Sequence, residues 1–440
     1  MRAHLRYFWF RVVSSLWLVP VSMIGAAVLL AFGMLYLDTV RPPSWLDPAR
    51  WLLRIGPEGA RQVLATIAGS MITVASLVFS MTLVTLTLAS SQLGPRLITR
   101  FVRDRVNQVV LGTFVATFVY AILVLETVSE SEAAPFVPQL SVMVGLILAL
   151  ISLLWLVYFI HHVADSIQAD TVIAELGEQL SDAIEHRFPE IELPGGTLLE
   201  TPFLDRLTEP PGVVAARKSG YIQAIDAGAL LRRASAQGLV IKVDARPGDF
   251  VVERAPLLFV WPRERFSDDL AEDLEKPIVI GPKRTPTQDI DFAVAALVEI
   301  ALRALSPGIN DPQTAMTCID RLTEALAEIM ADEEPPSLVP DGEGTIRLIV
   351  RPATFEGVIS AAFNPIRHAG HDDARVLRRL AESFTVLITF TRNQEQREII
   401  ARQAAATEAT CRAATLDPLA RGEVEHSLTV LRKALAERKH

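Results

Sequence analysis

Four apolar stretches without a charged side chain constrain the fold of this chain more than any other feature. They cover residues 12–37, 63–89, 106–125 and 137–160. Each reaches the roughly 20 residues that a helix needs to cross a bilayer. The first stretch is expected to be retained rather than cleaved as a signal peptide, because three more follow it. Residues 1–160 therefore predict a polytopic α-helical membrane protein with four transmembrane helices.

Small and hydroxyl side chains follow one face of the second stretch. Read at steps of three and four residues, this seam consists of Thr66, Gly69, Thr73, Ser76, Ser80, Leu83, Thr87 and Ser90. A helix repeats every 3.6 residues, so the spacing places these side chains in one stripe, with Leu83 as its single bulky apolar member. Such a stripe either packs helices closely and hydrogen-bonds between them or lines water in a channel. The eight residues are the candidate pore-lining residues.

Arginine residues orient the four spans. Arginines gather in the N-terminal segment and in the connection after the second span, at Arg2, Arg6, Arg11, Arg96, Arg100, Arg103 and Arg105. The connection after the third span carries Glu126, Glu130 and Glu132 and no base. The first outer loop holds only four arginines against the seven, and its Trp45 and Trp51 suit the headgroup layer. Both termini are therefore expected in the cytoplasm.

The remaining residues, 161–440, are expected to form about two cytoplasmic domains. Apolar spacing beyond His161 predicts that the fourth span continues as a helical extension over residues 161–188. Residues 285–440 predict a mixed α/β, mainly helical domain. The fold class is thus four transmembrane helices followed by an α+β region.

Short alternating strands predict a small β module over residues 213–262. Ile241, Val243 and Ala245 alternate with polar residues, and a Pro247-Gly248-Asp249 turn follows them. The pattern resembles a barrel-sandwich module of the biotinyl or lipoyl type. The stretch between the strand pairs, residues 229–233, lacks the modifiable lysine of carrier versions. A structural or docking module without a covalent cofactor is expected.

Other candidate sites favour architecture over chemistry. The loop before residue 312 exposes Asn310 and Asp311, which could bind a ligand, form a subunit contact, or cap the next helix. His161 with Asp165, and His368 with His371, have side chains that metals use, but no further ligands stand at a recognisable spacing. Capping explains Asp372 and Asp373 better. We expect no metal, no cofactor and no enzymatic activity, since nucleotide-binding and nucleophile motifs are absent.

Two long segments carry a family resemblance. Residues 76–96, SLVFSMTLVTLTLASSQLGPR, and residues 288–315, QDIDFAVAALVEIALRALSPGINDPQTA, resemble the bacterial family of predicted membrane proteins catalogued as domain of unknown function 2254. The resemblance implies a multi-pass protein of the bacterial inner membrane. It implies no activity.

Two functions remain open from the sequence. One is a homo-oligomeric channel or conduit, with the second span on its axis and a cytoplasmic vestibule. The other is a non-conducting scaffold or sensor whose cytoplasmic domain binds a ligand or protein. The net charge of −9 disfavours nucleic acid as a partner. The spans lack the ionisable residues that coupled transporters use. The permeant ion or ligand is not specified by these patterns.

The orientation is testable by cysteine labelling from outside intact cells. In a background without native cysteines, Ser131→Cys should react with a membrane-impermeant maleimide, because it lies in the acidic outer connection. Ser427→Cys should react only after the membrane is permeabilised. The reverse pattern would contradict the predicted orientation.

Overall fold

The computed structural model describes residues 18–40, 56–93, 104–129, 136–166, 168–185, 203, 207–285, 288–331 and 337–437, without the side chains of residues 89–93 and 166. The chain divides into two compact units, Met1–Gln168 and Ala169–His440. Several expectations fall outside the described residues. They concern the arginines before residue 18 and at 96–103, the loop 41–55, Glu130, Glu132, and the side chain of Ser90.

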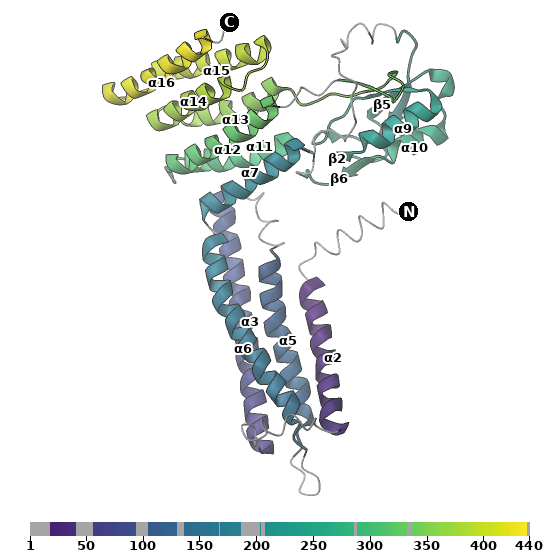
Figure 1. Cartoon of the computed structure of the whole chain (residues 1–440), viewed down its shortest axis with the longest axis vertical. Coiled ribbons are helices and arrows are strands. Elements are labelled where there is room, and N and C mark those ends of the chain that lie inside the picture. Colours follow the sequence, from purple (N-terminus) through teal and green to yellow (C-terminus); the bar gives the residue numbers. More distant parts are fainter. Residues whose placement is uncertain are drawn as a thin grey trace. The chain divides into compact units, whose positions relative to one another are not determined.

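In its described residues, the first unit has four helices that are long and apolar enough to cross a membrane. Their bounds are Leu18–Val40 (α2), Pro57–Leu93 (α3), Arg105–Thr127 (α5) and Gln139–Ser166 (α6). Helix α5 lies between α2 and α3 and also packs on α6 (Figure 1). It is 50% buried over its apolar window, against 17% for α2 and 22% for α3. The expected four spans are confirmed, and α5 is their common core.

Large side chains fill the interior of this bundle. Phe114 and Tyr120 of α5 and Phe159 of α6 are at most 1% exposed. The Tyr120 hydroxyl donates to the Ser141 carbonyl at 2.9 Å, and the Thr117 and Ser152 hydroxyls lie 3.1 Å apart. These buried polar groups are thus paired inside the chain, as an apolar surrounding requires.

Aspartates fix both ends of α6. The Asp38 carboxylate accepts from the backbone N–H groups of Leu140 and Ser141, both at 3.0 Å, and from the Ser141 hydroxyl at 2.7 Å. At the other end, Asp104 caps α5 by accepting from the Val106 N–H at 2.9 Å. The second Asp104 oxygen lies 2.6 Å from His162 Nε2 of α6. A carboxylate at a helix N-terminus also compensates the helix dipole.

The helix does not run unbroken from the fourth span to residue 188. Helix α6 ends at Ser166, Gln168 is not helical, and α7 covers Ala169–Glu185. The apolar spacing that predicted one helix is real, since Val172, Ile173, Leu176 and Leu180 are buried in α7. Those side chains pack against α11 and α12. The apolar periodicity of the sequence does not reveal this break, because the residues on both sides of it are helical.

Two open sheets form the β part of the second unit (Figure 1). The strands are β1 (Gly212–Ala215), β2 (Gly220–Ile225), β3 (Val240–Val243), β4 (Phe250–Val251), β5 (Pro256–Trp261), β6 (Ile278–Gly281), β7 (Leu338–Pro340) and β8 (Ile346–Ile349). One sheet has the order β1-β5-β3-β8-β7 and the other β4-β2-β6. The expected alternation in β3 is confirmed, with Ile241 and Val243 buried. Strands β7 and β8 come from residues far beyond 262.

The described strands do not form the expected barrel-sandwich topology. A helix, α9 (Ala227–Gln237), occupies the stretch where carrier modules have a hairpin tip. Asp226 caps its start and Gly238, at φ 61°, ends it in the left-handed conformation that favours glycine. Helix α10 (Asp268–Glu275) then precedes β6. Because β8 adds to β3 in parallel, the five-stranded sheet extends sideways and closes no barrel among the described strands.

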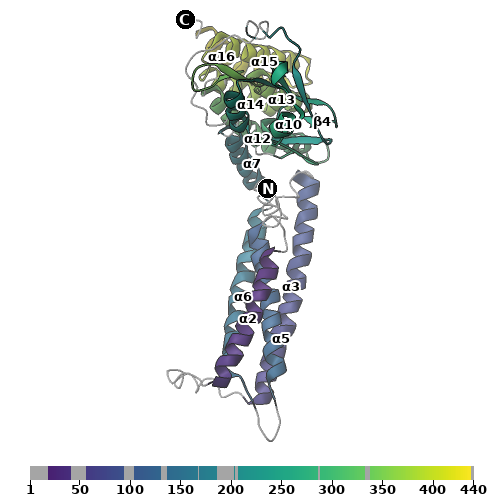
Figure 2. The ribbon, with the colours of Figure 1, turned by 90° about the vertical axis from the view of Figure 1, so that its right-hand side faces the viewer.

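Among the residues described in the second unit, six further helices follow residue 289. They are α11 (Ile290–Ala304), α12 (Pro312–Ala331), α13 (Phe355–Ala369), α14 (Ala374–Ile388), α15 (Gln394–Ala413) and α16 (Pro418–Glu437). Helix α14 packs on α12, α15 and α16 (Figure 2). Its Phe384 meets Phe363 of α13 edge to face, with ring centroids 5.3 Å apart. The expected α+β region is therefore present, with helices as its larger part.

A buried ion pair joins the β part to the helices. Asp289 is 2% exposed, caps α11 at the Phe292 N–H, and accepts two hydrogen bonds of 2.7 Å from Arg284. Gln288 beside it bonds both backbone groups of Ile225 in β2. The expected turn at Gly248 lies against this pair, and at φ 94° it has no room for a side chain because a Cβ would stand 2.4 Å from Asp289 Oδ2.

Removing this carboxylate should destabilise the second unit. Asp289→Ala strips the cap from α11 and leaves Arg284 without its partner, which we expect to lower the free energy of unfolding by about 2 kcal/mol. Asp289→Asn keeps a capping oxygen and should lose less. Thermal unfolding of the purified protein measures both. An Asp289→Ala variant as stable as the parent would contradict this role.

Candidate functional site on the outer face of α3

The seam predicted from the sequence lies on the uncovered face of α3. Its seven members with described side chains, Thr66, Gly69, Thr73, Ser76, Ser80, Leu83 and Thr87, are all exposed. The opposite face packs on α5 through buried Leu64, Ile67, Ala68, Ala75 and Val78. The chain thus uses the apolar face of α3 for its own core, and the described residues leave the hydroxyl face uncovered.

Large apolar side chains border the seam on both sides. At 100° per residue, Ile72 and Phe79 lie to one side of it, and Leu77 and Val84 to the other. All four are exposed, Leu77 by 61% and Val84 by 58%. Apart from the two chain neighbours of Gly69 and the nearby backbone of α3 itself, no atom of the described residues lies within 4 Å of the position that a Cβ on Gly69 would take. The seam is therefore a narrow stripe of short side chains between two apolar borders.

Most seam hydroxyls donate to their own helix. Thr66, Thr73, Ser76 and Thr87 each bond the carbonyl four residues earlier, at 2.7 to 2.9 Å. Ser80 makes no hydrogen bond within the described residues. A hydroxyl that donates its hydrogen to a backbone carbonyl can still accept a hydrogen bond with its oxygen lone pairs. The stripe can accept hydrogen bonds from water or from a neighbouring helix, and it tolerates an apolar neighbour at low cost.

The loop residues Asn310 and Asp311 belong to the second unit and serve its architecture. Asp311 accepts from the Thr314 N–H at 3.2 Å and from the Thr314 hydroxyl at 2.5 Å, which starts α12. Its own N–H donates to the Ala304 carbonyl at 2.8 Å. Asn310 adopts φ 50°, a conformation that asparagine tolerates better than most residues. The capping alternative describes what Asp311 does in the structure.

The histidine pairs are tied to nearby carboxylates and backbone. His161 Nε2 lies 3.3 Å from Asp165 Oδ2 on the exposed side of α6. His371 lies between the His368 carbonyl and the Asp372 carboxylate, both at 3.0 Å. Within the described part of the chain, no three histidine, cysteine or acidic side chains are grouped as a metal ion would require.

Asp373 is the N-cap of α14, as its position in the sequence indicates. It accepts from the N–H groups of Arg375 and Val376. Partial burial alone would raise the pKa of Asp373, but hydrogen bonds from the Arg375 guanidinium and from these backbone groups hold it below its usual value. The carboxylate stays charged and stabilises the start of the helix.

Sequence reasoning missed the residues that tie the spans together. Asp104 was not singled out, although an aspartate directly before a helix is a capping signal. Asp38 had no local signal, because its partners in α6 lie about a hundred residues later. A groove between α12 and α14, lined by residues of both, was also not foreseen.

Four apolar helices, with a paired polar interior and a separate α+β unit, define the chain as a polytopic membrane protein. Residues 13–385 match the family model described as predicted membrane protein, domain of unknown function 2254, and the chain belongs to that family. Uncharacterised proteins of Mycobacterium tuberculosis and Mycobacterium bovis are 31% identical over 378 residues, which cover 84% of this chain and 71% of each relative. No solved structure matches the chain.

Proposed function

We propose that the chain forms a homo-oligomer in the bacterial inner membrane, in which the seams of several α3 helices face a shared axis and line a water-filled conduit. In this proposal both termini and the second unit are cytoplasmic, the second unit forms a vestibule or regulatory domain, and the protein is not an enzyme. The observation that carries the proposal is the outward position of all seven described seam side chains on α3.

The packing of a single chain supports an assembly rather than a private pore. Phe114, Tyr120 and Phe159 fill the interior of the four-helix bundle, so a water path between these helices would have to displace core side chains. A ring of subunits encloses a path without such a cost. Helix α3 is suited to the axis because, among the residues that the structure describes, it packs on its own chain along one face.

A non-conducting scaffold is the alternative, and one observation favours it. Four seam hydroxyls are already satisfied by carbonyls of α3. Helices can therefore pack tightly along this stripe without leaving a polar group unpaired, as small residues allow in membranes. In this alternative the seam holds subunits together, and the second unit binds a ligand or protein.

Crosslinking tests whether seams face one another. Ser80→Cys should form dimers with a short flexible bismaleimide in membranes, whereas Ala75→Cys, 4% exposed and packed toward α5, should not. The native Cys318 and Cys411 are a low background, because burial raises the pKa of both thiols and disfavours the reactive thiolate. Absence of dimers at both Ser80→Cys and Thr73→Cys would contradict the assembly.

Conductance separates the conduit from the scaffold. Leu83 is 47% exposed and is the one bulky member of the seam, so a ring of Leu83 side chains would exclude water from the path. Leu83→Ser should raise the resting conductance of reconstituted bilayers several-fold. Val84→Ser, one residue away and 58% exposed on the apolar border, is the matched control and should leave conductance unchanged.

Crosslinked seams without conductance in any variant, under voltage or membrane tension, would support the scaffold and refute the conduit.

A further inference from the structure

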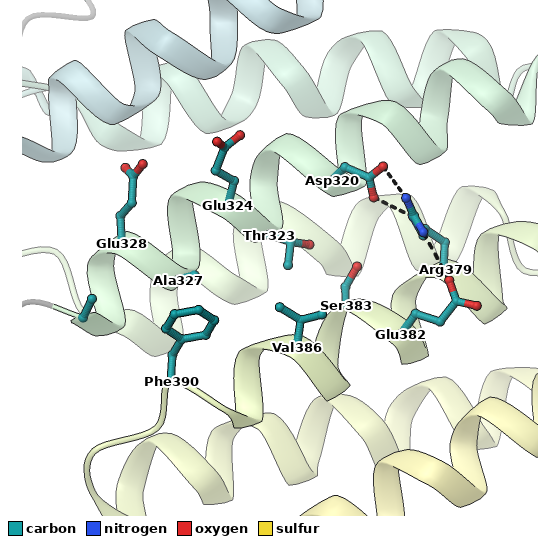
Figure 3. Close-up of a pocket in the computed structure, with 11 residues that line it drawn as sticks. Asp320, Thr323, Glu324, Ala327, Glu328, Arg379, Glu382, Ser383, Val386 and Phe390 are labelled. Carbon is teal, nitrogen blue, oxygen red and sulfur yellow. Dashed lines mark hydrogen bonds and ion pairs between the residues drawn. The ribbon is translucent and has the colours of Figure 1, made fainter.

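A groove of about 610 Å³ runs between α12 and α14 in the second unit (Figure 3). Its α12 side carries the carboxylates of Asp320, Glu324 and Glu328, each four residues from the next. Its α14 side carries Arg379 and Glu382 toward one end and Val386 and Phe390 toward the other. Four carboxylates and one guanidinium thus line the groove, which gives it a strongly negative rim.

Ion pairs close one end of the groove. The Arg379 guanidinium bonds both oxygens of Asp320 at 2.5 Å and reaches Glu382 at 3.3 Å. This bidentate contact fixes α12 against α14, and the pairing raises the pKa of Arg379. Arg379 is the only cationic side chain among the described residues that line the groove, and it pairs with Asp320 and Glu382. It does not reach the carboxylates at the other end of the groove.

The other end combines the carboxylates of Glu324 and Glu328 with an apolar floor. Glu328 accepts from the Ser181 hydroxyl at 3.1 Å and has no cationic partner in the described part of the chain. Glu324 is 55% exposed and pairs with Arg321, which does not line the groove. Below them, Val386 is 48% and Phe390 41% exposed. Exposed apolar side chains beneath an acidic rim suit a partner that is both apolar and basic.

A hydroxyl without a partner among the described residues also opens into this groove. Ser383 is only 4% exposed, its side chain points into the groove in Figure 3, and its hydroxyl has no hydrogen-bond partner within the described residues. Thr323 opposite is 7% exposed and donates to the Ile319 carbonyl at 2.7 Å. The Ser383 hydroxyl is therefore a position at which an occupant of the groove can form a hydrogen bond.

The neighbouring helix strengthens the negative field. Helix α7, which packs on α12, carries five acids and no base, at Asp170, Glu175, Glu178, Asp182 and Glu185. Such a one-sided charge distribution attracts cationic partners and raises their rate of association.

We propose that this groove binds an amphipathic helix of a partner protein, with lysine or arginine residues flanking its apolar face. From Asp320 to Ala331 the groove follows α12 for roughly 16 Å, which is three helical turns. The four-residue spacing of its carboxylates matches basic side chains at positions i and i+4 of a parallel helix. Val386 and Phe390 then contact the apolar face of the partner helix, which lies between its basic side chains, as in other helix-in-groove complexes. This inference does not depend on the seam or on conduction.

A model peptide tests the groove in the full chain. The protein is placed in zwitterionic nanodiscs and titrated against a fluorescent 18-residue helix of leucine and lysine, with empty nanodiscs subtracted. Glu324→Gln/Glu328→Gln should weaken binding about tenfold, since each exposed charge pair contributes modestly. Val386→Ser, which changes no charge, should weaken it several-fold. Glu253→Gln/Glu264→Gln, two exposed carboxylates elsewhere in this unit, removes the same charge and should not.

Four outcomes of the peptide titration would overturn the proposal, and a fifth concerns the oligomer. They are equal weakening by the groove pair and the control pair, no effect of Val386→Ser, no binding above empty nanodiscs, and equal binding of a leucine–glutamate helix. If the groove variants instead dissociate the oligomer and leave peptide binding unchanged, the occupant is a second copy of the chain, and the proposal of a separate partner fails. Thermal unfolding of each variant confirms that the fold persists.

Discussion

Pairing of polar groups inside an apolar bundle is the constraint on which the membrane unit depends. Lipid offers no hydrogen bonds, so each polar group in a span needs a partner within the protein. The structure meets this need at three depths. Asp38 holds the start of α6, Thr117 and Ser152 meet in the middle, and Asp104 joins α5 to His162 at the far end. Around these contacts, apolar packing alone determines how closely the helices approach.

The same constraint explains why α5 is central. It carries Thr113, Thr117 and Tyr120, all buried, and a helix with this many polar groups is best surrounded by protein. Helices α2 and α3 lie on either side of α5, and each exposes long apolar residues along its outer face. Among the described helices, α3 carries a stripe of mostly hydroxyl side chains between those residues, interrupted by Gly69 and Leu83. The seam is therefore a local departure from an otherwise lipid-compatible surface.

Much of this fold could be predicted from the sequence, because hydrophobic runs and periodicity are local signals. The four spans, the strands near Ile241 and the cap at Asp373 all follow from residues close together in the chain. The misses share a different cause. The break after Ser166 keeps helical spacing on both sides, and the five-stranded sheet recruits β8 from about a hundred residues beyond β3. Neither the helix break nor the β3–β8 pairing can be predicted from a short segment of the sequence.

The seam shows the same division between local and non-local information. Its stripe could be read directly from the spacing of Thr66 to Thr87, and so could the exception at Leu83. That the stripe faces away from α5 could not, because an identical pattern would serve equally well for packing inside one chain. The structure assigns the buried role to Leu64, Ile67 and Val78 instead.

Energetics narrow the options for an outward-facing hydroxyl stripe. Four of the five described seam hydroxyls donate to carbonyls of α3, so these four lose little in lipid, and polarity alone does not select a neighbour for the stripe. Shape does. Short side chains between Ile72, Phe79, Leu77 and Val84 allow close approach of another helix, and interhelical contacts of this kind contribute about 0.6 to 2 kcal/mol each. Water next to the stripe can donate hydrogen bonds to the free lone pairs of the hydroxyl oxygens. A second helix next to the stripe can instead pack closely against its short side chains. The Leu83 side chain cannot hydrogen-bond to water, but it can make an apolar contact with a packed helix. This one side chain therefore distinguishes the water-filled conduit from the packed scaffold.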